Sequence, residues 1–395
     1  MDEANVWAER QFGHAELGDR RRTRRLVQLA TEAVKRPSSI VSRACGTSAS
    51  REGAFRLLEN PQVRAEAVRE AIFEKTAKDC RGKEVVIVAV DATSLSIDDH
   101  DGQKGLGRVG PRAGRGLHAM TALALTNGGT PIGIAAQELW VRTKPSKLTK
   151  GRGEDPGEGR YWTDAIRSVE ARLAGSGTKP WFQLDRGADS WRVLQLASEL
   201  GSLITIRSRS DRNLDNGHNL WPTLQRAPIR AKASVKVAAQ CSWRQKRRRA
   251  NGKIFFEWLP PRKARTAKVE IHAAQVVLSC PTAIYTQKIL VPINAVYVRE
   301  TGRRSKDDRI EWLLLTTHPI TTRADVLAIV RGYTRRWRIE DFHRAWKDGF
   351  CRVEDTQLRS RDAICKWSTI LAAVATRAMR LTHLARETQD VLAST

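Results

Sequence analysis

The sequence predicts a mixed α/β protein in which a β-rich segment interrupts the α/β pattern and a small all-helical domain precedes it. Three observations lead to this fold class. Residues 1–80 show apolar residues at helical spacing, residues 81–210 alternate apolar strand-like runs with helical segments, and the same alternation returns after residue 307. At 395 residues the chain is long enough for two or three domains with buried cores.

The N-terminal region, residues 1–80, is predicted to contain helices over RRTRRLVQLATEAVKR, SASREGAFRLLENP and VRAEAVREAIFEKTAKDC. Five arginines crowd the first turns of the first of these helices, where positive charge opposes the helix dipole. Contact with phosphates therefore explains them better than helix stability does, and a solvated charged face is the alternative. The arginines are Arg20, Arg21, Arg22, Arg24 and Arg25.

The next region, residues 81–210, is predicted to be the first part of an α/β core. EVVIVAVDAT is a nearly continuous apolar run, which is typical of a strand buried on both faces. LHAMTALALT and GTPIGIAAQEL are strands joined by a hairpin turn at Asn127-Gly128-Gly129. The remaining elements alternate: a helix over YWTDAIRSVEARLAG, a strand over KPWFQLD, a helix over SWRVLQLASELG and a strand over LITIRSRS.

Residues 211–307 show a different, basic β pattern in ASVKVAAQ, KIFFEWLP, KVEIHAAQVVL and LVPINAVYVRE. The α/β pattern then resumes over 308–375, with a strand in IEWLLLTTHP and a long helix through Lys347, and a tail follows over 376–395. An insertion within one α/β domain explains this order. A separate linear domain is the alternative, but the returning strand and helix would then lack a sheet to join.

The charge of the chain indicates a polyanionic partner. Lys and Arg number 69 against 43 Asp and Glu, giving a net charge of +26 and a pI near 10.5. Between Arg209 and Lys268 there are 16 Lys and Arg against 3 Asp and Glu, so these residues carry half of the net charge. Charge concentrated in this way favours nucleic acid as the partner over a uniformly basic, merely soluble surface.

Other compositional features predict a cytoplasmic protein with no membrane association. The six cysteines are scattered and form no C-x-x-C pair, which favours reduced thiols over disulfides or a zinc site. The N-terminal residues show no signal-peptide pattern, and no apolar run approaches the length of a membrane span.

Three carboxylates in separate elements are candidate metal ligands. Asp91 ends the predicted strand EVVIVAVD and Asp185 ends KPWFQLD, at the strand ends where open α/β sheets place their chemistry. Glu340 lies within YTRRWRIEDFHRAWKDG, a basic and aromatic-rich run. Oxygen ligands of this kind suit hard divalent cations, so we expect Mg²⁺ or Mn²⁺ and two ions that together activate an attacking oxygen at phosphorus.

The helix predicted over residues 333–347 separates two kinds of side chain. Its buried stripe is expected to contain Ile339, Phe342 and Trp346. The opposite arc of about 100° carries Tyr333, Arg336, Trp337, Glu340, Arg344 and Lys347. Simple i,i+4 ion pairs worth about 0.2–0.5 kcal/mol could account for the glutamate, but not for the aromatic residues beside it.

The spacing Tyr333-x₂-Arg336-x₃-Glu340-x₆-Lys347 resembles the Y-R-E-K signature of bacterial DDE transposases of the insertion-sequence "four" family, to which the transposon-five transposase belongs. VDATSLS, LDRGAD and EWLLLTT are similar to the segments around the family's two aspartates and before its glutamate helix. LGDRRRTRRLVQLA and EGAFRLLENP are similar to the family's end-binding module. The resemblance extends from about residue 7 to residue 373.

This resemblance implies an RNase H-like catalytic core preceded by a helical DNA-end-binding domain. It implies cut-and-paste transposition at a Mg²⁺ site, with nicking, hairpin formation, hairpin opening and joining of the 3′-hydroxyls to target DNA. The partners would be the terminal repeats of the element, target DNA, and a second copy of the chain in a homodimeric synaptic complex, associated with the bacterial nucleoid when bound. The metal ligands would be Asp91, Asp185 and Glu340. The residues contacting DNA would be Tyr333, Arg336, Trp337, Lys347, Trp312, Arg21, Arg22, Arg25, Lys35 and Arg56, with the two tryptophans accommodating a flipped base.

Two other functions are compatible with parts of this pattern. A catalytically silent or truncated end-binding protein would keep the basic module but could lose the carboxylates, all three of which are present. A structure-directed nuclease would not need an end-reading module or base-flipping tryptophans. The 55 residues after Glu340 are few for the family's pairing region, which predicts dimerisation by another surface or a truncated copy. His118 is expected to be a satisfied core residue, and His343 to lie off the face of Glu340.

Overall fold

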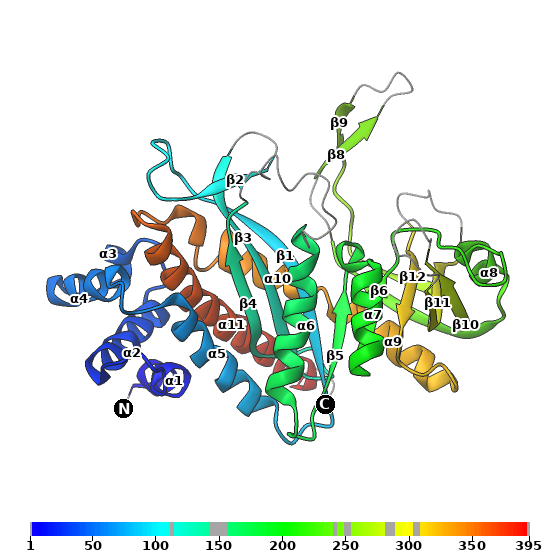
Figure 1. Ribbon diagram of the computed structural model, residues 1–395, viewed down its shortest axis with the longest axis horizontal. Coiled ribbons are helices and arrows are strands. Elements are labelled where there is room, and N and C mark those ends of the chain that lie inside the picture. The colour runs from blue at the N-terminus through cyan, green and yellow to red at the C-terminus, as the bar shows by residue number, and fades with distance from the viewer. Residues whose placement is uncertain are drawn as a thin grey trace. The chain divides into compact units, whose positions relative to one another are not determined.

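The computed structural model describes residues 2–110, 114–142, 157–239, 243–248, 254–280, 289–302 and 309–392 (Figure 1). The chain divides into two compact units. The first consists of residues 1–206 together with 332–395, and the second of residues 207–331. The segment predicted to be an insertion, residues 211–307, belongs to the second unit. The division into five predicted segments stays a prediction.

The N-terminal part of the first unit is helical, as the apolar spacing predicts. Helix α2 begins after Asp19, whose side chain accepts a hydrogen bond from the backbone N–H of Arg21 at 2.8 Å. Helix α4 begins with a reciprocal capping box between Thr47 and Ser50. The apolar side of α2 is buried. The helices are α1 (Glu3–Phe12), α2 (Arg20–Lys35), α3 (Val41–Ala44), α4 (Ser48–Glu59) and α5 (Ala65–Cys80).

The sheet of the first unit runs in the order β2-β3-β1-β5-β6, with β4 also paired to β3. Strand β1 is antiparallel to β3 and parallel to β5, and β5 is parallel to β6. The predicted hairpin joins β3 to β4, and Gly129 supplies the positive φ of +94° in its turn. The strands are β1 (Val85–Ser96), β2 (Gly107–Val109), β3 (Gly114–Leu125), β4 (Pro131–Trp140), β5 (Lys179–Leu184) and β6 (Leu203–Arg207).

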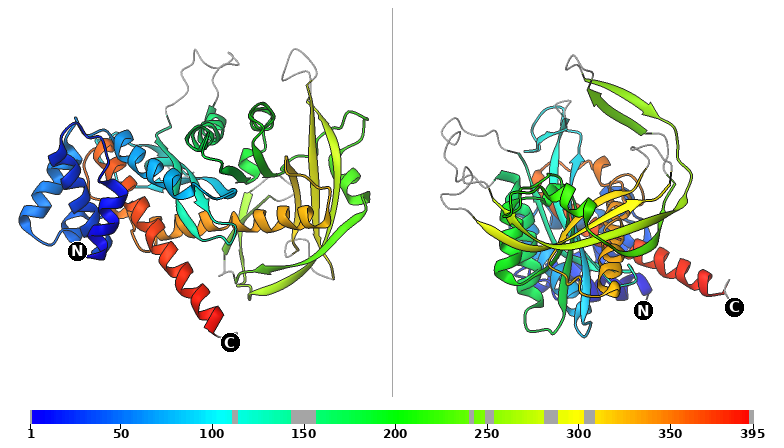
Figure 2. Two further views of the ribbon diagram at one scale, coloured as in Figure 1. Left: turned by 90° about the horizontal axis from the view of Figure 1, so that it is seen from below. Right: turned by 90° about the vertical axis from the view of Figure 1, so that its right-hand side faces the viewer.

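Helices cover both faces of this sheet (Figure 2). Helices α6 and α7 lie on one face, and α10 and α11 lie on the other. Residues 86–90 of β1 are buried, which is why this strand shows no polar alternation in the sequence. The elements are α6 (Arg160–Leu173), α7 (Trp191–Leu200), α10 (Arg338–Lys347) and α11 (Arg361–Leu392), with short 3₁₀ turns η1 (Gly157–Gly159), η2 (Arg186–Ala188) and η3 (Val353–Asp355).

The second unit is built on antiparallel strands in the order β12-β11-β10-β7, with a separate two-stranded ribbon of β8 and β9. The four strands predicted in residues 211–307 correspond to β7, β9, β10 and β11, whereas β8 was not predicted. The elements are β7 (Ile229–Val237), β8 (Trp243–Arg248), β9 (Ile254–Leu259), β10 (Arg265–Ser279), β11 (Leu290–Glu300), β12 (Glu311–Thr316) and α8 (Leu220–Arg226), and α9 (Arg323–Arg335) leads back to the first unit.

Every helix in the described residues is too short or too polar to cross a lipid bilayer. The cysteines in those residues are all free thiols, as the scattered spacing predicts. Cys241 lies outside the described residues.

Candidate active site

The register between β1 and β5 brings the two predicted aspartates to neighbouring positions. The parallel pairing ends at Val90 and Leu184, so Asp91 and Asp185 are the next residues on adjacent strands. Adjacent strands lie about 4.8 Å apart, which places the two carboxylates at one edge of the parallel pair. The prediction that Asp91 ends its strand is wrong, because β1 continues to Ser96 through its antiparallel pairing with β3.

The Asp91 carboxylate is largely removed from solvent, with 13% of its side chain exposed. Its Oδ1 accepts a hydrogen bond from the backbone N–H of Ala92 at 2.8 Å. Burial raises the pKa of Asp91 to about 7, the charge of Arg336 opposes this rise, and the charges of Asp185 and Glu340 add to it. Asp91 therefore lies in a group of mutually repelling carboxylates with a buried cation beside it.

Asp185 begins the short turn η2. Its Oδ1 accepts a hydrogen bond from the backbone N–H of Gly187 at 2.7 Å, which fixes the carboxylate at the end of β5. Gly187 permits this close approach, since a Cβ there would lie 3.0 Å from Asp185 Oδ1 and 3.2 Å from Trp162. Asp185 is partly exposed and acts electrostatically on both Asp91 and Arg336.

The continuous helix predicted over residues 333–347 is broken. Helix α9 ends at Arg335, and α10 begins at Arg338. At the break, the backbone N–H of Arg336 bonds to the carbonyl of Tyr333 at 3.1 Å, which is the tighter i→i−3 pattern. The predicted apolar stripe of α10 is confirmed, because Ile339, Phe342 and Trp346 are fully buried.

The break places Arg336 between two of the carboxylates. Its Nη1 donates to Asp91 Oδ2 at 3.2 Å, and its Nη2 donates to Glu340 Oε1 at 3.4 Å. Only 9% of the Arg336 side chain is exposed. Burial disfavours its charge, but Tyr333, Asp91 and Glu340 outweigh this and raise the pKa of Arg336. The guanidinium therefore stays charged and holds the two carboxylates at a fixed separation.

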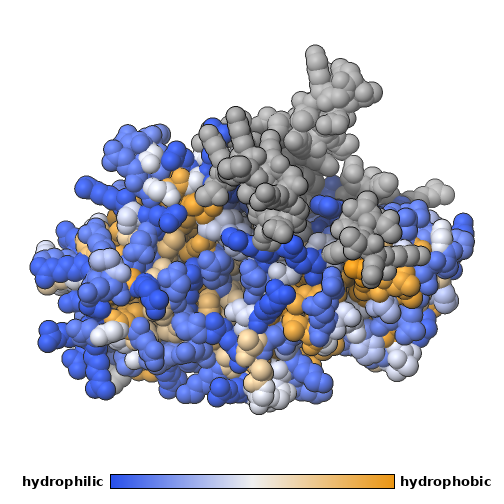
Figure 3. Space-filling model, viewed as in Figure 1, coloured by the Kyte–Doolittle hydropathy of each residue, from blue (hydrophilic) through white to orange (hydrophobic). Residues whose placement is uncertain are grey.

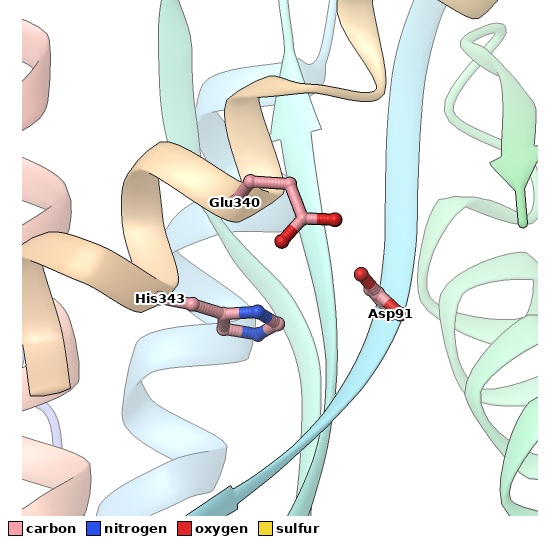
Figure 4. A group of neighbouring side chains, drawn as sticks. All are labelled: Asp91, Glu340 and His343. Atoms are coloured by element: carbon pink, nitrogen blue, oxygen red, sulfur yellow. The ribbon is translucent and has the colours of Figure 1, made fainter. Parts of the chain in front are cut away.

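A histidine completes a group of potential metal ligands. One ligand atom each from Asp91, Glu340 and His343 lie within 4.8 Å of one another. Figure 4 shows the Glu340 carboxylate pointing toward Asp91, with the His343 ring beside them on α10. The expectation that His343 lies off the face of Glu340 is wrong, because a residue three positions along a helix is displaced by only about 60°.

His343 has the properties of a neutral nitrogen donor. It is 7% exposed, and burial together with the charges of Lys347 and Arg336 lowers its pKa to about 3. Its Nε2 is buried and has no hydrogen-bond partner among the described residues. An unprotonated imidazole beside two carboxylates fits a divalent cation, with the oxygens suiting Mg²⁺ or Mn²⁺ and the nitrogen suiting Mn²⁺ better than Mg²⁺.

Comparison with known families agrees with this geometry. Residues 83–376 match the family model described as transposase DDE domain, which covers most of the chain. The chain belongs to the DDE transposase family. Residues 4–63 match the family model described as transposase DNA-binding. A transposase with a DNA-binding segment, predicted from the sequence, is therefore confirmed, and the Y-R-E-K assignment stays a prediction.

The transposase holds the other residues predicted to contact DNA near the carboxylates in different surroundings. Tyr333 is buried on α9, and Trp337 is 57% exposed at the start of α10. Lys347 ends α10 and pairs with Glu354 Oε1 at 3.5 Å. Trp312 belongs to β12 of the second unit, opposite Val298 of β11. The DNA contacts assigned to these residues stay predictions.

The predicted cations of the transposase's N-terminal helices divide into two groups. Four of them make contacts within the protein: Arg22 with Leu17 and Gln62, Arg25 over Gly53, Lys35 with Asp2, and Arg56 with Glu52. Arg21 is exposed, as are Arg20, Arg24 and Arg51, and none of these side chains has an ion-pair partner in the described residues. Hydrophilic side chains cover most of this part of the face seen in Figure 3. Arg51 was not among the residues predicted to contact DNA, although it lies on the same helix as Arg56, which was.

Proposed function

We propose that this transposase moves an insertion sequence by cut-and-paste transposition, and that it belongs to the insertion-sequence "four" type with the Y-R-E-K signature. The observation that supports this best is the pair Asp91 and Asp185 on adjacent parallel strands, with Glu340 supplied by a helix on the same sheet. This arrangement is the one expected of an RNase H-like core. The reaction is hydrolysis at the element ends followed by transfer of the 3′-hydroxyls to target DNA.

The three carboxylates are proposed to hold two divalent cations, Mg²⁺ or Mn²⁺. Such ions, when bound, lower the pKa of the attacking oxygen and stabilise the leaving oxygen. Asp91 and Glu340 would supply oxygens, His343 would supply a neutral nitrogen, and Asp185 would supply an oxygen from the neighbouring strand.

Arg336 is proposed to organise this ligand set before DNA arrives. Its two contacts keep the Asp91 and Glu340 carboxylates from moving apart under their mutual repulsion. With the Asp91 and Glu340 oxygens engaged by a cation, the Arg336 guanidinium would be available to a phosphate of the DNA. Arg336 thus has a role inside the centre as well as the DNA contact implied by the signature.

The DNA is proposed to approach across the exposed end of α10. Trp337 offers an exposed flat ring for a displaced base, and stacking of this kind is worth about 1–3 kcal/mol per base. Lys347 can exchange Glu354 for a phosphate, since their ion pair is at 3.5 Å and partly exposed. Tyr333 and Trp312 are proposed to assist, as are the cations of the N-terminal helices.

The partners proposed are duplex DNA of the terminal repeats, target DNA and a second copy of the chain. The reaction takes place in the bacterial cytoplasm at the nucleoid. A catalytically silent end-binding protein is the alternative function, and the experiment below separates the two.

The test is cleavage of a duplex made from the DNA that flanks the gene, with Mg²⁺ present. The unaltered protein is expected to release hairpin-ended products. We expect the rate of cleavage to fall at least about 10³-fold in three variants, each of which should bind the duplex as before: Asp91→Asn, Asp185→Asn and Glu340→Gln. Asp101→Asn, which changes an exposed aspartate on the same unit, serves as the matched control. Binding without cleavage by the unaltered protein would favour the silent end-binding protein, and full cleavage by all three variants would remove the carboxylates from the reaction.

A further inference from the structure

Three consecutive residues of α11 contact three separate elements of the first unit. Lys366 reaches the end of α4, Trp367 reaches the segment between α2 and α3, and the carbonyl of Ser368 reaches α10. The first two elements lie in the segment matched by the DNA-binding model, and α10 carries Glu340. A single turn of α11 therefore connects the DNA-binding helices to the helix of the carboxylate centre.

Lys366 is fully buried, and its ammonium group is satisfied within the protein. Its Nζ lies 3.0 Å from the carbonyl oxygen of Leu58, 2.8 Å from that of Asn60 and 2.5 Å from Asp362 Oδ2. These three acceptors match the three N–H donors of an ammonium group. The carbonyls belong to the C-terminal end of α4, where the helix dipole favours a cation. Moving α4 away would leave the buried ammonium group with only the Asp362 carboxylate of its own helix and two unsatisfied N–H donors, so this contact holds α4 firmly.

Trp367 and Ser368 extend the connection in two directions. Trp367 is fully buried and its Nε1 donates to the carbonyl of Ser39 at 2.8 Å. The carbonyl of Ser368 accepts a hydrogen bond from Trp346 Nε1 at 3.0 Å. Trp346 is itself fully buried on the apolar stripe of α10. Because all of these groups are close-packed and directional, small relative shifts of the helices would break them.

We propose that Lys366 and Trp367 are positioning residues that set the distance between the DNA-binding helices and the carboxylate centre, and thereby select which phosphodiester is cut. A transposase that grips the end of its element with one segment and cuts with another needs a fixed spacing between them. A misplacement of about 1 Å in a reacting geometry can cost about 10²-fold in rate. This proposal rests on the proposed function, because it presupposes cleavage at a defined position.

The experiment maps the cut at nucleotide resolution on the flanking duplex, under single-turnover conditions and at saturating protein. Lys366→Met removes the ammonium group but keeps most of the side-chain volume, and Trp367→Phe removes the N–H that bonds to Ser39. Each variant is expected to bind the duplex within about twofold of the unaltered protein, to cut at least about tenfold more slowly, and to spread its cuts over neighbouring phosphodiesters.

The control variant is Lys78→Met, which removes an exposed ammonium group from α5 and is expected to cut as the unaltered protein does. A single cut at the original position and rate in Lys366→Met and Trp367→Phe would overturn the proposal. Loss of DNA binding in proportion to loss of cutting would also overturn it, because it would show that these residues only stabilise the DNA-binding fold. If Lys366→Met does not fold, Trp367→Phe carries the test. Failure of the unaltered protein to cut any site would instead refute the proposed function.

Discussion

The N-terminal helices and the carboxylate centre both concentrate charge, but they do so in opposite ways. On α2, Arg20, Arg21 and Arg24 are exposed and have no ion-pair partner within the described residues. In the centre, Arg336 is 9% exposed and bridges Asp91 and Glu340. Exposed charges are screened by salt and attract DNA over a distance, whereas buried charges interact strongly and fix the positions of their neighbours.

This difference separates affinity from chemistry within one chain. If the exposed arginines contact DNA as proposed, replacing them one by one is expected to have graded effects, because separate phosphate contacts contribute additively to affinity. The buried group behaves as a unit, because removing one member leaves the others uncompensated. The two regions should therefore respond to substitution as differently as their burial indicates.

The largest expected effect on stability is that of Arg336→Met. Loss of this guanidinium leaves the Asp91 and Glu340 carboxylates facing each other, so we expect the free energy of unfolding to fall by about 3 kcal/mol. The matched control is Arg344→Met on the same helix, where the side chain is 72% exposed and pairs with Asp341. That change is expected to cost less than about 1 kcal/mol. Urea denaturation of both variants measures the difference, and equal losses would contradict it.

Arg336 also shows what the sequence could and could not predict. The apolar stripe of α10 and the strand β1 follow from local periodicity, and the structure confirms both. The break between α9 and α10 does not follow, because residues 333–347 keep helical spacing throughout. At the break Arg336 contacts Asp91, a residue 245 positions away, and local spacing carries no information about such a contact. Helical geometry alone could have placed His343 among the candidate metal ligands, because it lies three residues from Glu340.

The register between strands also could not be predicted from local sequence patterns. The sequence indicates that Asp91 and Asp185 each follow an apolar run, but not that these runs pair with Val90 opposite Leu184. The buried role of Lys366 was equally hidden, because a lysine in an apolar helix carries no sign of the carbonyl groups that receive it. Local periodicity thus predicted most of the elements, though not β8 or the break between α9 and α10, and long-range contacts decided which of their polar residues meet.

The next largest effect is expected from the exposed region. Replacing Arg20, Arg21 and Arg24 together by Ala should weaken duplex binding by about 10²-fold at low salt and reduce the salt slope of log Kd by about 2–3. The rate of cutting at saturating DNA should not change, because these residues lie outside the carboxylate centre. The control removes the same charge from residues outside the segment 4–63, by changing Lys78, Arg81 and Lys179 to Ala. An equal loss in the control would show that net charge alone determines binding.

A smaller effect is expected from His343→Gln. If the buried Nε2 contributes to metal binding, this variant should lose about tenfold in affinity for Mn²⁺ and less for Mg²⁺, because imidazole favours Mn²⁺. Titration of bound Mn²⁺ by electron paramagnetic resonance measures this without any cleavage. His100→Gln, an exposed histidine in the same unit, is the control. Unchanged affinity for both ions would exclude His343 from the ligand set.

The smallest expected effect is on the pH dependence of the free energy of unfolding, through the buried histidine His118. This histidine is 5% exposed, stacks on Trp140, and contacts Ser94 Oγ at 3.1 Å and the carbonyl of Arg108 at 3.3 Å. Burial lowers its pKa; the charge of Arg142 lowers it further, while the Arg108 carbonyl and the charge of Glu158 oppose the shift.

Below pH 6.5 the unfolded chain therefore binds more protons at this residue than the folded chain does. The contribution of His118 to stability is complete above pH 6.5 and decreases as the pH falls toward its folded pKa. His118→Gln removes this titration, so its free energy of unfolding should fall less between pH 7.5 and pH 5.5, by a difference of less than about 1 kcal/mol. Urea denaturation at the two pH values measures it, with His100→Gln as the exposed control. A steeper pH dependence in His118→Gln than in the unaltered protein would reverse the sign and contradict the assignment of a buried, neutral imidazole.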